Sequence, residues 1–150
     1  GWNAFSLVTG TPTGNDFIQV SAGDAHSVAL RSDGSLVSWG SDSFLQVTDT
    51  PSSNGFTQVS AGDGDMSVAL HADGSLSSWG DDLSFHVTDT PTGNDFTQVS
   101  AGNAHSVALR SDGSLVSWGS DSFLQFTNTP IGNDFIQVSA GGYYSVAIKF

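Results

Sequence analysis

The sequence has no cysteine and no glutamate, and among its 150 residues only Arg31, Arg110 and Lys149 are basic. The lack of cysteine excludes disulfides and thiolate chemistry. Three cations against fifteen aspartates, a net charge of −12, cannot neutralise a phosphate backbone, so we expect no binding to nucleic acid. Because aspartate favours turns whereas glutamate favours helices, the composition also argues against helical structure.

No apolar run approaches the roughly 18 residues that a membrane helix needs, so we expect no membrane insertion. The first residues, GWNAFSLVTG, lack the basic, apolar and cleavage regions of a signal peptide. A sequence rich in Ser, Thr, Gly, Asn and Asp, without Cys and with little Lys, agrees with an extracellular or particle-surface protein. A cytoplasmic location stays open.

The sequence is a tandem repeat with a period of about 40 residues. Phe17, Phe56, Phe96 and Phe135 fall in register, with spacings of 39, 40 and 39 residues. This divides a single repeat domain into the tail of a broken unit (1–16), three full units (17–55, 56–95 and 96–134) and a partial unit (135–150). The first and third full units are identical at 32 of 39 positions.

Each full unit predicts three strands, which in the first unit are Phe17–Ala22, Ser27–Arg31 and Ser35–Trp39. The second and third runs are joined by Asp33-Gly34, a strong hairpin signal because both turn positions tolerate positive φ. We interpret Phe44–Thr48 as a connection rather than a fourth strand. The last unit supplies only its first two strands, which gives eleven strands in all.

Antiparallel units of this size cannot bury both faces alone and are stabilised by stacking on their neighbours. We therefore predict an all-β protein, a β-propeller segment of about four three-stranded blades of which one is incomplete. A linear β-solenoid is the rival fold, but its rungs are shorter and lack a hairpin in each unit. Trp39, Trp79 and Trp118 are large enough to fill the gaps between blades.

The pattern Ala-Gly-x-x-His-Ser-Val-Ala-Leu, Asp-Gly-Ser-Leu and Ser-Trp-Gly-x-Asp-x-x-x-Gln resembles the repeat of the regulator of chromosome condensation family. The resemblance covers essentially the whole chain and implies a propeller. The period and three-stranded unit are also similar to those of the propeller-type β-lactamase inhibitory protein. That relative carries aromatic residues after Ala-Gly in nearly every blade, whereas Ala25 and Ala104 stand there in this chain and only Tyr143 is aromatic, so we do not expect β-lactamase inhibition.

The chain departs from this family in the loop that follows each Trp-Gly pair. Members of the family place Asn two residues after the Gly and a further Gly before the Gln. Here the Asn is replaced by Asp42, Asp82 and Asp121, and the Gly by Leu45, Phe85 and Leu124. These departures put a bulkier and more acidic loop where the family has a tight turn.

If the strands of each blade run up, down and up, the first-to-second turns and the loops after the third strands share one face. We predict that this loop face binds a protein partner through apolar anchors ringed by Asp. The alternative is that Phe44 and Phe123 cap the interiors of the blades. The predicted residues are Asp24, Asp42, Phe44, Leu45, Asp63, Asp65, Met66, Asp82, Leu83, Phe85, Asp121, Phe123, Leu124, Tyr143 and Tyr144.

Nothing in the sequence predicts an enzyme, a cofactor or a metal centre. No Ser-His-Asp or Cys-His arrangement stands out, and the scarcity of Glu and Lys removes common general acids and bases. We interpret His26 and His105 as structural repeat positions, and His71 and His86 as surface substitutions. Asp63-Gly64-Asp65 could hold a cation through oxygen ligands, although the calcium-loop motif requires a terminal Glu that this chain lacks.

The sequence thus predicts a non-catalytic interaction scaffold that binds a protein partner or itself through the loop face. Alternatives are a structural subunit of a surface or particle assembly, and a lectin with one sugar site per blade. A two-stranded blade leaves an unpaired edge, so we expect either a homo-oligomer or part of a longer propeller. We assign this oligomer edge to Trp2, Phe5, Lys149 and Phe150.

Overall fold

The computed structural model describes residues 7–150, and within them every regular element is a β-strand. Each strand has the β-branched and aromatic composition typical of sheets and ends at Gly, Asp or a polar turn. The strands are β1 (Phe17–Ala22), β2 (His26–Arg31), β3 (Leu36–Gly40), β4 (Phe56–Ala61), β5 (Met66–His71), β6 (Leu76–Gly80), β7 (Phe96–Ala101), β8 (His105–Arg110), β9 (Leu115–Gly119), β10 (Phe135–Ala140) and β11 (Ser145–Lys149). No segment of these residues forms a helix long and apolar enough to cross a bilayer.

The strands form three three-stranded antiparallel sheets, β1-β2-β3, β4-β5-β6 and β7-β8-β9, and a two-stranded sheet, β10-β11. The predicted all-β fold with three-stranded repeat units is therefore confirmed, and 44–48 forms turns rather than a strand. Equivalent residues pair in each sheet: Ser27 lies opposite Trp39, and Ser106 lies opposite Trp118.

The Asp-Gly hairpin is present in each full blade, but its geometry differs from the prediction. Only the glycine has positive φ, +81° at Gly34, and the N–H of Gly34 donates to the carbonyl of Arg31. The Asp33 carboxylate instead accepts the N–H and hydroxyl of Ser35. The turn is therefore a three-residue loop closed by a left-handed glycine, with Asp acting through its side chain.

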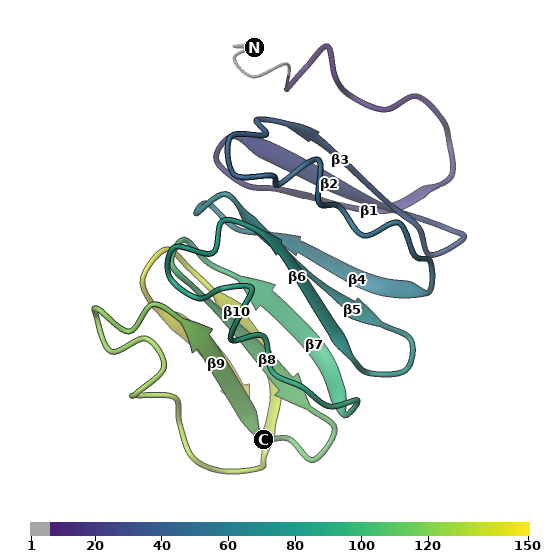
Figure 1. Ribbon diagram of the computed structural model, residues 1–150. Helices are drawn as coiled ribbons and strands as arrows, with labels where there is room; N and C mark the ends of the chain where they lie inside the picture. The colour runs from purple at the N-terminus through teal and green to yellow at the C-terminus, as the bar shows by residue number, and fades with distance from the viewer. Residues whose placement is uncertain (1–6) are drawn as a thin grey trace.

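The four sheets follow one another as an open arc of blades from the N-terminus to the C-terminus (Figure 1). Neighbouring blades are joined by a hydrophobic core: Val28 and Leu30 of the first pack against Phe56, Val59 and Trp79 of the second. The second joint repeats these contacts with the equivalent residues, including Trp118. The predicted role of Trp79 and Trp118 between blades is confirmed, since both are buried.

The inner strands β1, β4, β7 and β10 are also connected by polar side chains. The Gln58 amide donates to the carbonyl of Val99 at 3.0 Å, and its oxygen accepts the N–H of Val99 at 3.1 Å. Ser60 Oγ accepts the N–H of Ala101 at 3.0 Å. Gln19, Ser21 and Ser100 make the equivalent contacts at the other two joints, and the Gln98 oxygen accepts the N–H of Val138 at 2.9 Å. The free edges of β4, β7 and β10 thus receive hydrogen bonds from the blade before them.

After β1, β4 and β7 the chain continues with a glycine, because the next blade approaches too closely for a side chain. A Cβ added at Gly62 would lie 2.3 Å from the carbonyl oxygen of Gly102, and one added at Gly102 would lie 2.2 Å from that of Gly141. Backbone atoms cannot withdraw without moving a whole blade, so any larger residue would separate the blades at this point.

Candidate functional site

The loops that follow β3, β6 and β9 each close around an aspartate. In the first loop the Asp42 carboxylate accepts the N–H groups of Val47 and Thr48, both at 2.9 Å, together with the Thr48 hydroxyl. Asp82 and Asp121 make the same three bonds in their loops. Because one side chain holds three donors from the far end of the loop, each loop has one defined path.

These aspartates remain charged at neutral pH. Hydrogen bonds from Thr48 and then Val47 lower the pKa of Asp42, and those from Thr127 and Phe126 lower the pKa of Asp121. At Asp82 burial raises the pKa, but bonds from Thr88 and Val87 outweigh it, so the net shift is again downward. The loops therefore carry negative charge, and each of these carboxylates accepts hydrogen bonds from the backbone of its own loop.

Each of these loops contains a bulky residue in the left-handed backbone region. The φ angles of Leu45, Phe85 and Leu124 are +63°, +60° and +63°. Such a conformation costs an L-residue with a side chain about 1 kcal/mol or more relative to glycine. The same cost recurs in three blades.

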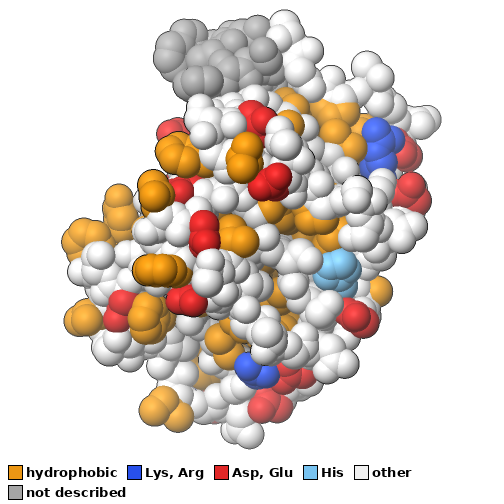
Figure 2. Space-filling model, viewed as in Figure 1, with side chains coloured by type: hydrophobic (Ala, Val, Ile, Leu, Met, Phe, Trp, Pro, Cys, Tyr) orange, Lys and Arg blue, Asp and Glu red, His pale blue; other side chains and the backbone are white. Residues whose placement is uncertain are grey.

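The left-handed turns hold apolar side chains out in solvent. The six residues concerned are between 41% and 79% exposed, and they are Phe44, Leu45, Leu83, Phe85, Phe123 and Leu124. The exposure of Phe44 and Phe123, 41% and 67%, favours presentation at the surface over the alternative that they cap the blade interiors. On the left side of Figure 2, hydrophobic and acidic side chains are interspersed from one blade to the next.

The first-to-second turns lie beside these loops, as the predicted loop face requires. The N–H of Ser41 donates to the carbonyl of Ala25 within the first blade. Between blades, the Gln46 amide donates to the Asp65 carboxylate at 2.8 Å. Tyr143 lies edge-to-face with Phe123, with ring centroids 5.1 Å apart. The six exposed apolar side chains of these loops, which we call the apolar row, are thus extended onto the last blade.

The other predicted loop-face residues divide by exposure. Asp24, Asp63 and Tyr144 are exposed, whereas Asp65 is half-buried by its bond to Gln46. The prediction for Met66 is wrong, because Met66 is fully buried and packs in the core between the second and third blades. It begins β5 and pairs with Gly80 as His26 pairs with Gly40, so the extra residue of the second unit lies before it, in the turn.

The three basic residues are not at the loop face, because they lie at the opposite ends of the middle strands. Arg31 binds Asp16 at 2.7 Å and lies 4.6 Å from the centre of the Phe17 ring, and Arg110 repeats both contacts. Lys149 binds Asp134 at 2.8 Å. All the cations of the chain are thus engaged elsewhere, and the loop face keeps its negative charge without basic residues.

Of the predicted oligomer edge, Trp2 and Phe5 lie outside the described residues. Phe150 is almost fully exposed, and the Lys149 side chain is partly exposed beside Asp134. The structure also shows end residues that the sequence did not single out. Val20 is 65% exposed although its counterpart Val59 is 1% exposed, and Val146 is exposed where Val107 is buried.

The histidines have structural environments. His26 Nε2 lies 2.8 Å from Ser67 Oγ, and His105 Nε2 lies 2.8 Å from Ser145 Oγ, in each case across a blade joint. Burial lowers the pKa of both, so they are neutral at pH 7. The prediction that His86 is a surface residue is wrong, because it is buried and its carbonyl accepts the Trp118 indole N–H. Within residues 7–150 no three His or Asp side chains come together as a metal site.

The glutamine and serine contacts between inner strands were also missed from the sequence. Gln58 and Ser60 occupy alternate strand positions, which normally indicate a solvent-facing side of a sheet. Only the recurrence of Gln-Val-Ser-Ala-Gly in all four units could have indicated that the Gln and Ser side chains have the same structural role in each blade.

Two segments, residues 17–46 and 96–125, match the family model of the Regulator of chromosome condensation (RCC1) repeat. A search of curated proteins gave no match. The chain is similar to the ectodomain of the receptor kinase CR4 from Physcomitrella patens, with a TM-score of 0.73 and 26% identity over 89% of this chain and 38% of that one.

Two further solved structures share the fold. Prp20p from Saccharomyces cerevisiae, studied with its binding to Gsp1p and histones, has a TM-score of 0.73 and 20% identity over 92% of this chain and 44% of that one. The CRINKLY WD40 ectodomain of the receptor kinase ACR4 from Arabidopsis thaliana has a TM-score of 0.70 and 23% identity over 89% and 45%. The chain thus spans less than half the length of these structures.

Proposed function

Since the chain carries repeats of the regulator of chromosome condensation type and folds into propeller blades, we propose that it is a non-catalytic interaction module. Its loop face binds a protein partner. Prp20p, which has the same fold, is described with protein partners, Gsp1p and histones. This supports a binding role for the fold, whereas the identity of a partner depends on the loops.

The main support for the proposal is an exposed apolar residue with a strained backbone conformation, which recurs in three blades. Leu45, Phe85 and Leu124 all hold left-handed φ values while their side chains lie in solvent. Neither feature stabilises the chain, because glycine would fit the turn better and a polar side chain would suit water better. Strain that recurs without a structural benefit is typical of a binding site.

The charge around these anchors indicates the kind of partner. Asp42, Asp82 and Asp121 are ionised beside the apolar row, and the three cations of the chain are bound to aspartates elsewhere. A complementary surface would have apolar pockets for Phe and Leu and a rim of Lys or Arg. We expect the association rate with such a partner to fall as salt is added.

The test selects a displayed random-peptide library on the immobilised chain. The comparison variant carries Leu45→Gly, Phe85→Gly and Leu124→Gly, which suit the observed backbone and remove the anchors. We expect the selected peptides to combine aromatic or aliphatic residues with Lys or Arg, and to bind the variant about 30-fold or more weakly. Peptides that bind both proteins equally would refute the loop face as the binding site.

A Phe44→Ala and Phe123→Ala variant is the matched second test, since it removes two anchors without touching the left-handed positions. Neither side chain belongs to the buried core, so the free energy of unfolding should fall by only about 1–2 kcal/mol, part of it from the Phe123–Tyr143 ring contact. A loss of peptide binding with the chain still folded separates recognition from folding.

The exposed end faces favour a second role, as a part of a larger propeller assembly. Val20 lies exposed on the first blade, as do Val146 and Ile148 on the last, whereas their counterparts are buried at each internal joint. Another blade of the same type would cover either face. Measurement of the mass in solution tests this: a monomer of 15.5 kDa at all concentrations would exclude self-association.

A further inference from the structure

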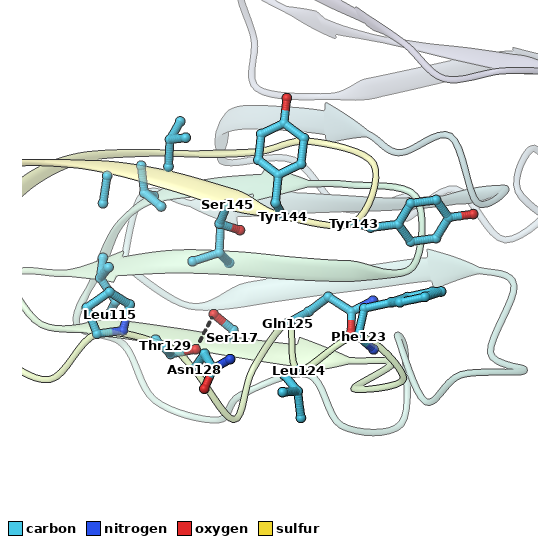
Figure 3. A pocket seen from close by; sticks show the side chains of 15 residues that line it. Leu115, Ser117, Phe123, Leu124, Gln125, Asn128, Thr129, Tyr143, Tyr144 and Ser145 are labelled. Atoms are coloured by element: carbon cyan, nitrogen blue, oxygen red, sulfur yellow. Dashed lines mark hydrogen bonds between the residues drawn. The ribbon is translucent and has the colours of Figure 1, made fainter.

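A cavity of about 280 Å³ lies between the third and fourth blades, beside β11 (Figure 3). Its apolar walls come from both blades: Val107 and Leu115 on one side, Val138 and Ala147 on the other. The loop after β9 closes one end through Phe123, Leu124 and Gln125. Of these residues only Phe123 and Leu124 also belong to the loop face of the proposed function.

At the other two complete joints the equivalent space holds a tryptophan. Trp79 shares a core cluster with Val28, Leu36, Val59 and Ala69. Trp118 packs with the corresponding residues Val68, Leu76, Val99 and Ala108. The four residues that line the cavity are the third set of counterparts. The cavity is therefore shaped as an indole site by the same repeat sequence that surrounds the other two indoles.

The backbone acceptor for an indole N–H is also repeated. Trp79 Nε1 donates to the carbonyl of Gln46 at 3.0 Å, and Trp118 Nε1 donates to that of His86 at 2.9 Å. Gln125 is the counterpart of both loop residues, and it lines the cavity. Its side chain is buried, and its Nε2 has no partner among the described residues.

The strand beside the cavity, β11, has one edge that is unpaired within residues 7–150. In the complete blades the middle strand pairs on both sides, as β8 pairs with β7 and β9, whereas β11 pairs only with β10 in the described chain. The outer edge of β11 therefore offers backbone donors and acceptors next to the cavity. A ligand that satisfies both features must be a polypeptide with an indole side chain.

We propose that β11 and this cavity bind an extended polypeptide segment of the type Leu-Val-Ser-Trp-Gly. The segment adds as an antiparallel third strand, in the β-augmentation mode. The register follows from the third blade, where Ser106 faces Trp118 and His105 faces Gly119. The ligand Trp thus lies opposite Ser145 and its Gly opposite Tyr144, and the indole enters the cavity and donates to the Gln125 carbonyl.

The test uses a labelled synthetic peptide with the sequence of residues 112–121, DGSLVSWGSD, titrated with the 150-residue chain and followed by fluorescence anisotropy. The control peptide has alanine in place of its Trp. We expect saturable binding of the first peptide and binding about 30-fold or more weaker for the second. No binding at millimolar protein, or equal binding of the two peptides, overturns the proposal.

A cavity-filling variant locates the site. Ala147→Phe places a ring in the cavity from β11 itself, and it should weaken peptide binding at least about tenfold. Val20→Thr, a change on the opposite end face, should leave binding unaltered. A 5-fluorotryptophan peptide provides a readout that does not depend on the variant: its ¹⁹F signal should shift on binding, as expected for a buried indole. An unshifted signal in the bound peptide overturns the indole assignment.

Discussion

The glutamine contacts between inner strands allow one substitution to be compared in two environments. Gln58 makes two hydrogen bonds to the backbone of Val99, which is 1% exposed. Gln137 occupies the same position in the last blade, where it is exposed and its side chain has no hydrogen bond to another described residue. Alanine at each position therefore separates the contact between blades from the intrinsic preference of the strand.

We expect Gln58→Ala to cost about 2–4 kcal/mol of folding free energy. The variant loses two bonds and leaves the Val99 N–H and carbonyl buried without partners, at about 1–3 kcal/mol for each unsatisfied group, reduced where water enters the space left by the side chain. Gln137→Ala should change stability by less than about 0.5 kcal/mol, since an exposed side chain without partners is removed.

Urea unfolding followed by intrinsic tryptophan fluorescence measures both values, at a concentration where the chain is monomeric. The midpoint for Gln58→Ala should fall while the slope with denaturant is retained, because the loss is in stability and not in exposed area. Equal costs for the two variants, or a cost below about 1 kcal/mol for Gln58→Ala, would refute the role assigned to this contact.

Three further predictions concern the core, the histidines and the loop face. Trp79→Ala should destabilise the chain by about 3–5 kcal/mol in urea unfolding, and Trp39→Ala by clearly less, because Trp79 is fully buried whereas Trp39 is only half-buried. Burial lowers the pKa of His26, which Asp65 only partly opposes. The unfolded chain therefore binds more protons, and stability should decline as pH falls below about 6.5; a His26→Gln variant should show a smaller decline across a series of urea midpoints. Leu45→Gly should raise the thermal midpoint or leave it unchanged, since relief of the left-handed strain offsets the greater freedom of glycine in the unfolded chain; a clear loss of stability would show that Leu45 is a core residue.

The strands and their stacking could be predicted because the same pattern of apolar and turn residues occurs in three full repeat units. The run Phe17–Ala22 was predicted with its observed bounds, and the third strand differs by one residue at each end. Burial of Trp79 followed from its size and its recurrence. These features depend on apolar side chains with a period of two, which is the part of a sequence that most directly reports a sheet.

The wrong predictions concern residues whose burial is decided by their position in the fold and not by their residue type. Met66 is predicted on the loop face together with the turn residues Asp63 and Asp65, although it occupies the buried place of His26. His86 was interpreted as a surface substitution, but its backbone carbonyl is what the neighbouring indole needs. In both cases contacts with the neighbouring blade decide the environment, and a single sequence does not show those contacts.

The second unit gives the best argument that the loop face is a recognition surface. Its loop reads Asp82-Leu83-Ser84-Phe85 where the first reads Asp42-Ser43-Phe44-Leu45. The apolar residues have changed identity and one has moved, yet two remain exposed in each loop. A blade cap would have to keep its position, because it fills a fixed space, whereas a binding surface needs only apolar area held outward beside a charged rim. The left-handed residue, Phe85 in place of Leu45, is the fixed element, so what the two loops share is the means of presenting an apolar side chain to solvent.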